Sequence, residues 1–188
     1  MPEPLPIRYR LANGRPVISV TQVLSLAGRI DTQWFTEESR ERGSLVHRLT
    51  ESFDRREDVL VPPAVMGYME AYQMFLSVVR PIYSASELAV TSDDDALGGC
   101  IDRVCLSLFG EPGILDFKTG PPAPWHALQL AAYNALRPTG ARWACYLQPN
   151  GRYKLKQYDD PMDHRKFVYD LEKVAGTVTP DGDVWRWR

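Results

Sequence analysis

Two acidic residues and a lysine stand within segment 98–120, in positions where they could bind a metal ion and act on a phosphate. Asp102 comes first, and Asp116-Phe117-Lys118 follows after an interval long enough for one hairpin. Carboxylates hold hard divalent cations, which prefer oxygen ligands. Such cations polarise a phosphate and lower the pKa of a bound water, while a lysine can orient that water or neutralise developing charge. The set predicts metal-assisted phosphodiester hydrolysis.

The strand that ends in Asp116-Phe117-Lys118 places the acid and the lysine together. Side chains alternate between the two faces of a strand, so Asp116 and Lys118 share one face, while Leu115 and Phe117 point to the other. A stretch with one glycine and two prolines, residues 119–122, then ends the strand at an edge that a substrate can reach. The alternative is an ordinary surface ion pair, because a short D-x-K motif also recurs by chance.

A histidine and a further acid precede this segment. His47 lies on a predicted helix, four residues before Glu51, and neutral imidazole is a common metal ligand. The alternative is a partly buried structural histidine. Glu87 lies on the strand expected before the Asp102 strand. It is an additional acid candidate for the site, or else a solvent-facing strand residue.

An amide and a phenol follow the lysine on another predicted helix. Gln129 and Tyr133 are four residues apart, so they lie nearly above one another on one helix face. Together they can hydrogen-bond a phosphate, an active-site water or a catalytic carboxylate. The alternative is a pair of polar residues at the solvent edge of the helix.

These motifs, taken in order, resemble those of a known superfamily. The set R-G-S-x-V-H, G-G-x-I-D-R-V, I-L-D-F-K-T-G and Q-L-A-A-Y looks like the PD-(D/E)XK nucleases. The upstream histidine and the downstream Q-x-x-x-Y are typical of the RecB-type branch. The opening I-S-V-T-Q-V-L, residues 18–24, also resembles the start of small phage-encoded members and of mitochondrial genome-maintenance exonucleases. The resemblance covers residues 17 to 158.

The resemblance implies a role for each matched residue. The implied metal ligands are His47, Asp102, Asp116 and the backbone carbonyl of Phe117, with Glu87 as a looser match. Lys118 would be the catalytic lysine, and Gln129 and Tyr133 would organise the site and contact DNA. The catalytic set is then Asp102, Asp116, Lys118, Gln129 and Tyr133.

The activity that this resemblance implies is that of a deoxyribonuclease dependent on Mg²⁺ or Mn²⁺, with His47 favouring Mn²⁺. We expect an exonuclease that acts on DNA ends or single strands, in recombination, repair or phage DNA processing. The alternative is a catalytically silent subunit, for nucleic-acid binding or assembly, that keeps the nuclease fold. The presence of the D-x-K motif argues against that alternative.

The sequence also predicts which cofactors and partners are absent. Some RecB-type nucleases hold an iron–sulfur cluster on four cysteines, whereas this chain has three, so an all-cysteine cluster is excluded. No G-K-T or G-K-S occurs, so no phosphate loop for nucleotide binding is expected. A helicase or recombination protein would be a separate partner.

Length and composition favour one soluble domain. The chain has 188 residues, 44% of them hydrophobic, which can build a sizeable core. Three cysteines without regular spacing suggest a reducing compartment. No segment resembles a signal peptide or a membrane span, which predicts the cytoplasm of a bacterial or phage-infected cell and no membrane partner.

The charge distribution also bears on nucleic-acid binding. A net charge of −2 argues against a passive nucleic-acid coat. Local basic strips could still bind DNA, or else be solvated helix faces. The candidates are Arg40, Arg42, Arg48, Arg55 and Arg56, and then Lys154, Lys156, Arg165 and Lys166.

The pattern of elements predicts an α/β fold with a restriction-endonuclease-like core, in which helices flank a mixed central sheet. A helical region at about 20–80 precedes a catalytic core at about 82–158 and a C-terminal helix and tail at 161–188. Strands near 82–91, 99–109 and 113–118 would form a mostly antiparallel meander, followed by a crossover helix from Pro124 and a hairpin across 149–151. Trp185 and Trp187 in the tail could stack on bases or cover the core.

Overall fold

The computed structural model describes residues 9–10, 16–31, 36–92 and 96–175. A 3₁₀ turn at Pro63–Val65 precedes one of the helices. The helices are α1 Val20–Leu26, α2 Glu37–Asp54, α3 Met66–Val79, α4 Trp125–Leu136 and α5 Met162–Val174. The strands are β1 Tyr9–Arg10, β2 Pro16–Ser19, β3 Ile82–Thr91, β4 Leu97–Leu108, β5 Glu111–Lys118, β6 Ala141–Leu147 and β7 Tyr153–Gln157.

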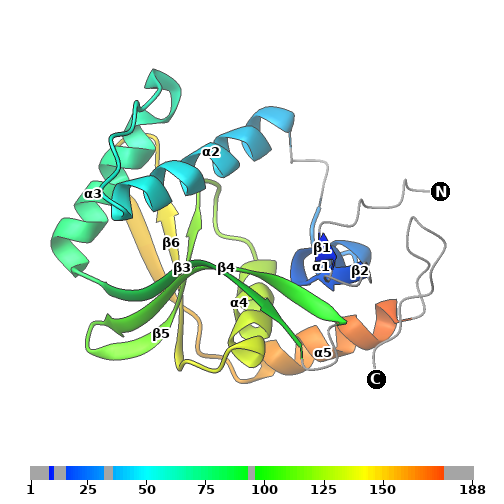
Figure 1. Ribbon diagram of the computed structural model, residues 1–188. Helices are drawn as coiled ribbons and strands as arrows, with labels where there is room; N and C mark the ends of the chain where they lie inside the picture. The colour runs from blue at the N-terminus through cyan, green and yellow to red at the C-terminus, as the bar shows by residue number, and fades with distance from the viewer. Residues whose placement is uncertain (1–8, 11–15, 32–35, 93–95, 176–188) are drawn as a thin grey trace.

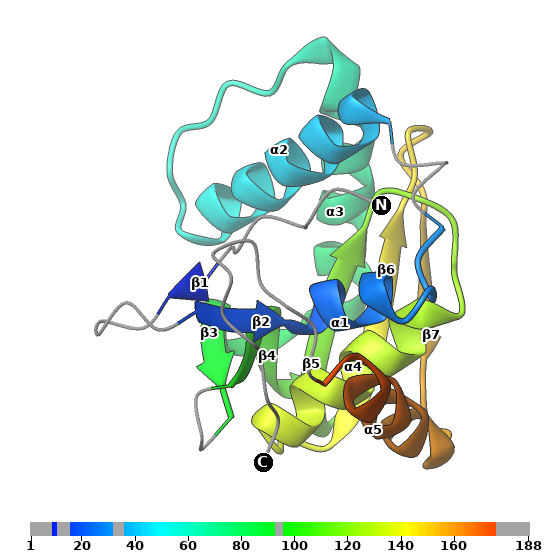
Figure 2. The same cartoon turned by 90° about the vertical axis from the view of Figure 1, so that its right-hand side faces the viewer.

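One mixed sheet of seven strands organises the molecule, in the order β1-β2-β4-β5-β6-β7, with β3 paired to the other edge of β4 (Figures 1 and 2). The 12-residue strand β4 has two successive partners on one edge. β2 runs parallel to its start, at Leu97 and Gly98, and β5 runs antiparallel to its second half, from Arg103 onwards. β5 and β6 are parallel and joined through α4. The fold is therefore α/β and fits a restriction-endonuclease-like core.

Two hydrophobic cores cover the two faces of the sheet. α2 and α3 pack on one face, and α1, α4 and α5 pack on the other (Figure 1). Strand β5 contributes to both, because its side chains alternate: Leu115 and Phe117 belong to the α2–α3 core, and Ile114 to the other. The Phe117 ring meets the rings of Tyr72 and Phe75 edge-on, with centroids 5.1 and 5.7 Å away.

Side chains at their first turns fix where two helices begin. Ser19 accepts a hydrogen bond from the Gln22 N–H at 3.1 Å, and the Gln22 side chain accepts one from the Ser19 N–H at 2.9 Å. This reciprocal capping box begins α1 where β2 ends. The hydroxyl of Thr36 caps α2 by accepting from the Ser39 N–H. The sheet-to-helix turn at Ser19 brings α1 close to the start of β4.

The expected helices and strands are confirmed wherever the structure describes them. β4 begins at Leu97, two residues earlier than expected, because Leu97 and Gly98 pair with the distant strand β2. Asn13-Gly14, a dipeptide typical of hairpin turns, lies outside the described residues, as do residues 32–35 and the tryptophan tail. Within the described part of the chain, no helix has both the length and the apolar composition to cross a bilayer.

Two helical glycines should respond in opposite ways to a methyl group. A Cβ on Gly67 of α3 would lie 1.9 Å from the carbonyl oxygen of Pro149, whereas one on Gly43 of α2 would meet nothing closer than 3.7 Å. Helix propensity favours alanine over glycine by up to about 1 kcal/mol. We therefore expect Gly43→Ala to stabilise the protein by about 0.5–1 kcal/mol, and Gly67→Ala to destabilise it by about 1–3 kcal/mol.

Urea unfolding at fixed pH would measure both effects as shifts of the transition midpoint at unchanged slope. Gly43→Ala is the matched control, because it makes the same chemical change in a helix with room for it. A Gly67→Ala variant as stable as the wild type would contradict the close packing of α3 on the turn after β6.

Candidate active site

The site lies where strands β4 and β5 separate. Their main-chain pairing ends at Arg103 and Leu115. Beyond that point the Phe117 N–H donates to the Asp102 carboxylate, at 2.7 Å, instead of to a main-chain carbonyl. Asp102 and Asp116, 6% and 3% exposed, lie at this fork. The D-x-K strand and the upstream acid, 14 residues apart in sequence, are therefore brought together as expected.

Helix α2 brings His47 to the same fork. Its Nδ1 lies 3.3 Å from Asp102 Oδ2 and 3.9 Å from Glu87 Oε1. Ligand atoms of His47, Glu87 and Asp102 all lie within 4.8 Å of one another, so these three residues could hold a metal ion. Glu87 thus lies beside His47 and Asp102 and does not simply face solvent. Glu51 does not join this group; its carboxylate pairs with Arg55.

Glu87 reaches the group from an unusual backbone conformation. It has φ 49° in the middle of β3, between residues that pair regularly with β4. Left-handed backbone is uncommon for residues other than glycine, and such strain persists only where the surroundings fix it. Glu87 lies between the paired residues Ser86 and Leu88, whose partners Arg103 and Ile101 flank Asp102. No sequence pattern marks this feature.

The ammonium of Lys118 is held on the α4 side of β5, opposite to the face that carries Phe117. It lies 2.7 Å from Asp116 Oδ2 and donates to Gln129 Oε1 at 2.7 Å. The ring centroid of Trp125 lies 5.1 Å away. Gln129 Nε2 donates to the hydroxyl of Tyr133 at 3.3 Å. Gln129 and Tyr133 are both buried, which excludes a position at the solvent edge of the helix. The helix face that they share points to Lys118.

Two further residues of the site had no clear signal in the sequence. Thr21, in the first turn of α1, accepts from Gln129 Nε2 at 3.4 Å, which turns the amide oxygen towards Lys118. A Cβ on Gly99 would lie 2.5 Å from the Tyr133 ring. The second glycine of the G-G-x-I-D motif therefore leaves space for that ring. The motif was the available hint, but Tyr133 as its partner could not be read from spacing.

Charge governs the protonation of the site. Burial alone would lower the pKa of His47, but the Asp102 carboxylate, helped by Glu87, outweighs it and raises the pKa to about 10. Burial would raise the pKa of Asp102, but His47 and Lys118 hold it below its usual value. Burial and the charge of Asp102 raise the pKa of Asp116 to about 6, against the effect of Lys118. A further cation at the site would therefore favour the ionised form of Asp116.

The donor set fits a hard divalent cation. It consists of carboxylate oxygens and one imidazole nitrogen, which suit Mg²⁺ and Mn²⁺. Asp116 Oδ2 is buried and accepts no aligned hydrogen bond from any described residue, although the Lys118 ammonium is near. A strand residue directs its N–H and C=O to the same neighbour. We therefore expect the Phe117 carbonyl, like its N–H, to be directed into the fork.

Comparisons with known proteins find solved structures of limited similarity but no family. No family model matches the chain, and no curated protein matches it. The solved structure of SSO0001 is 15% identical, with 88% of this chain and 77% of that chain covered and a TM-score of 0.45. LHK-Exo in complex with dAMP is 12% identical, with 84% and 87% covered and a TM-score of 0.45. Neither structure assigns a function to this chain.

The pKa values of the half-buried His47 and the buried His126 should be shifted in opposite directions in the metal-free protein. We expect His47 to remain an imidazolium up to a pKa of about 10, whereas burial lowers the pKa of His126 to about 3. His126 Nδ1 accepts from the Ala123 N–H at 3.2 Å, which fits a neutral ring protonated at Nε2. Nitrogen-15 NMR of the imidazole rings between pH 5 and 9 would distinguish the two states.

Asp102→Asn should lower the His47 pKa, because it removes the main charge that raises it. The extra proton on folded His47 stabilises the metal-free protein below the unfolded pKa of 6.5, and this stabilisation is lost as the pH rises to about 10. A His47 ring that becomes neutral near pH 6.5 in the wild type would contradict the charge arrangement described above.

Proposed function

We propose that the protein is a divalent-metal-dependent nuclease that hydrolyses phosphodiester bonds of DNA, as an exonuclease on ends or single strands. The observation that carries this proposal is the fixed ammonium of Lys118, 2.7 Å from the buried Asp116 carboxylate. Phe117, which stands between these two residues in β5, donates its N–H to Asp102. Both charged groups of an ordinary surface ion pair would be exposed, whereas here Asp116 is buried and Lys118 is half-buried at the fork of two strands.

The proposed metal ligands come from five residues. His47, Asp102 and Glu87 form the close group, and Asp116 and the carbonyl of Phe117 would complete the set from strand β5. A bound Mg²⁺ or Mn²⁺ would polarise the phosphate and lower the pKa of a water at this position. His47 favours Mn²⁺, because imidazole suits transition metals better than Mg²⁺. Metal binding has to displace the proton of His47, so the metal affinity is expected to rise with pH below about 10.

Lys118 is the residue proposed to act on the reacting phosphate. Asp116 and Gln129 hold its ammonium from two directions, and the Trp125 ring covers another. A cation fixed in advance stabilises the charge that develops on phosphoryl oxygens without a cost of reorganisation during the reaction. It can equally orient the attacking water. Gln129 and Tyr133 then act as positioning residues, because Gln129 accepts from Lys118 and donates to Tyr133.

The substrate strand is proposed to leave the site across β6 towards the edge strand β7. Lys118 is in register with Tyr146, and Tyr146 with Lys154, so the two lysines lie on one sheet face roughly 10 Å apart. Lys156 lies on the same face, 4.4 Å from the ring of Tyr158. Of the other basic candidates, Lys166 and Arg55 are engaged in ion pairs.

Removal of either charged group of the D-x-K pair should abolish cleavage. We expect Asp116→Asn and Lys118→Met to slow metal-dependent cleavage of end-labelled DNA by about 10²–10⁴-fold, and EDTA to stop cleavage by the wild type. The assay compares single-stranded with double-stranded DNA, and the product ladder gives the polarity. Binding of uncleaved DNA to the variants, measured by fluorescence anisotropy, should persist.

The exposed pair of Asp160 and Lys166, 3.1 Å apart near the start of α5, offers matched controls. Asp160→Asn and Lys166→Met make the same chemical changes outside the site and should cleave at the wild-type rate. Wild-type protein that binds DNA but cleaves it with neither Mg²⁺ nor Mn²⁺ would favour the alternative of a silent nucleic-acid-binding subunit.

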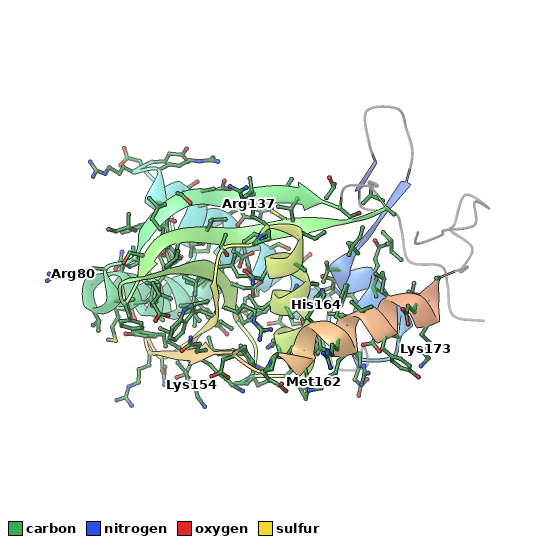
Figure 3. All side chains as sticks on the ribbon, turned by 90° about the horizontal axis from the view of Figure 1, so that it is seen from below. Arg80, Arg137, Lys154, Met162, His164 and Lys173 are labelled. Atoms are coloured by element: carbon green, nitrogen blue, oxygen red, sulfur yellow. The ribbon has the colours of Figure 1, made fainter. Side chains whose placement is uncertain are left out.

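Lys154 should contribute to binding through a phosphate contact. In a cleavage-deficient Asp116→Asn background, Lys154→Ala should reduce the slope of log affinity against log salt for single-stranded DNA by about 0.7. Lys173→Ala on α5 is the control, since Lys173 is also exposed but projects from a distant part of the molecule (Figure 3). If the salt dependence of binding had the same slope in both variants, Lys154 would make no phosphate contact. Its role would then be to protect the exposed edge strand β7 from pairing with other chains.

A further inference from the structure

A fully buried arginine lies directly behind the proposed metal ligands. Arg103 follows Asp102 in β4 and is 0% exposed. A buried charge is costly unless it is paired and hydrogen-bonded. The guanidinium meets this demand by donating to Asp54 Oδ2 at 2.8 Å and to the backbone carbonyl of Asp102 at 2.7 Å. Its remaining contacts lead to two of the proposed ligands.

The first contact leads to Glu87. Arg103 Nη1 donates to Glu87 Oε1 at 3.3 Å. The same carboxylate oxygen lies 3.9 Å from His47 Nδ1. Glu87 is the residue with left-handed backbone in β3, and a partner that holds its carboxylate in place can sustain such strain. Arg103 therefore fixes which way this carboxylate points.

The second contact leads to His47 through a hydroxyl. Arg103 Nη2 donates to Thr50 Oγ1 at 3.2 Å, and Thr50 Oγ1 donates to the carbonyl oxygen of His47 at 2.9 Å. Thr50 is fully buried. Together with the Asp54 contact, this attaches the last turns of α2 to β4 at two points. The helix turn that carries His47 is thereby set relative to Asp102.

Two aromatic rings limit the movement of the guanidinium. Its central carbon lies 5.5 Å from the ring centroid of Phe117 and 5.7 Å from that of Tyr83. Phe117 is also the residue whose N–H binds Asp102. Arginine suits this place because its planar fork donates in several fixed directions, which a lysine ammonium cannot reproduce.

We propose that Arg103 is a positioning residue that sets two metal ligands, Glu87 directly and His47 through Thr50, at the spacing that one cation requires. This inference rests on the proposed metal-dependent function. It differs from a purely structural role, in which Arg103 would only attach α2 to the sheet. The structural role predicts lower stability with unchanged metal affinity, whereas the positioning role predicts weaker metal binding by protein that is still folded.

A matched pair of substitutions at Thr50 tests the hydroxyl link. Thr50→Val removes the hydroxyl and keeps the shape, and Thr50→Ser keeps the hydroxyl. Mn²⁺ affinity of the metal-free proteins would be measured by electron paramagnetic resonance of free Mn²⁺, well below each melting temperature. We expect Thr50→Val to bind Mn²⁺ about 10- to 100-fold more weakly, and Thr50→Ser to bind it close to the wild-type affinity.

Arg103→Lys tests the direct contact with Glu87 and should weaken Mn²⁺ binding by about 10- to 100-fold. Arg142→Lys is the control, because Arg142 is also buried and paired, with Asp163 at 3.3 Å, but lies on the α4–α5 side of the sheet. It should lose stability and keep the Mn²⁺ affinity. If Arg103→Lys fails to fold, the Thr50 pair still decides the question.

Wild-type Mn²⁺ affinity in folded Thr50→Val and Arg103→Lys would overturn the positioning role and leave the proposed nuclease intact. Equal losses in Thr50→Ser and Thr50→Val would also overturn it, because they would remove the hydroxyl as the cause. Wild-type protein that binds neither Mn²⁺ nor Mg²⁺ would instead overturn the proposed metal-dependent function itself, and the positioning role with it.

Discussion

In the hydrogen bond from the Phe117 N–H to the Asp102 carboxylate, a side chain takes the place of the main-chain acceptor that would continue the β4–β5 ladder. A buried N–H has to find an acceptor, so β5 can leave β4 at this point only because a carboxylate supplies one. The two strands then separate with their polar groups satisfied. The opening between them is where the carboxylates of the site meet, and every other part of the site is arranged around it.

Side chains of β5 alternate between the two faces of the sheet, so the fork is held in place by different contacts on each face. Phe117 points into the α2–α3 core, where the rings of Tyr72 and Phe75 fix its position. Its peptide group is therefore held towards Asp102. The neighbouring residues Asp116 and Lys118 must point to the opposite face, where α4 supplies Gln129 to the lysine. Aromatic packing on one side of the sheet thus sets the polar geometry on the other, without a direct contact between the two.

The parts of this arrangement that depend on local periodicity could be predicted from the sequence. The shared face of Asp116 and Lys118 follows from the two-residue repeat of a strand, and the α/β order of elements follows from runs of apolar residues. Contacts between distant segments could not be predicted. The pairing of Leu97 with β2, the Tyr133 ring over Gly99, and the burial of Arg103 each depend on packing between segments that are far apart in the chain. Sequence spacing carries no signal for them.

The charges of the site explain why it should favour a metal and a phosphate together. In the metal-free protein four carboxylates face three cationic groups, because Arg103 pairs with Asp54 as well as with Glu87. The other two carboxylates, Asp102 and Asp116, face His47 and Lys118. The surplus negative charge matters because uncompensated charge is costly in a largely buried site. Exchange of the His47 proton for a divalent cation would compensate this surplus. The loaded site would therefore repel the negative charge of a phosphodiester less than the metal-free site does.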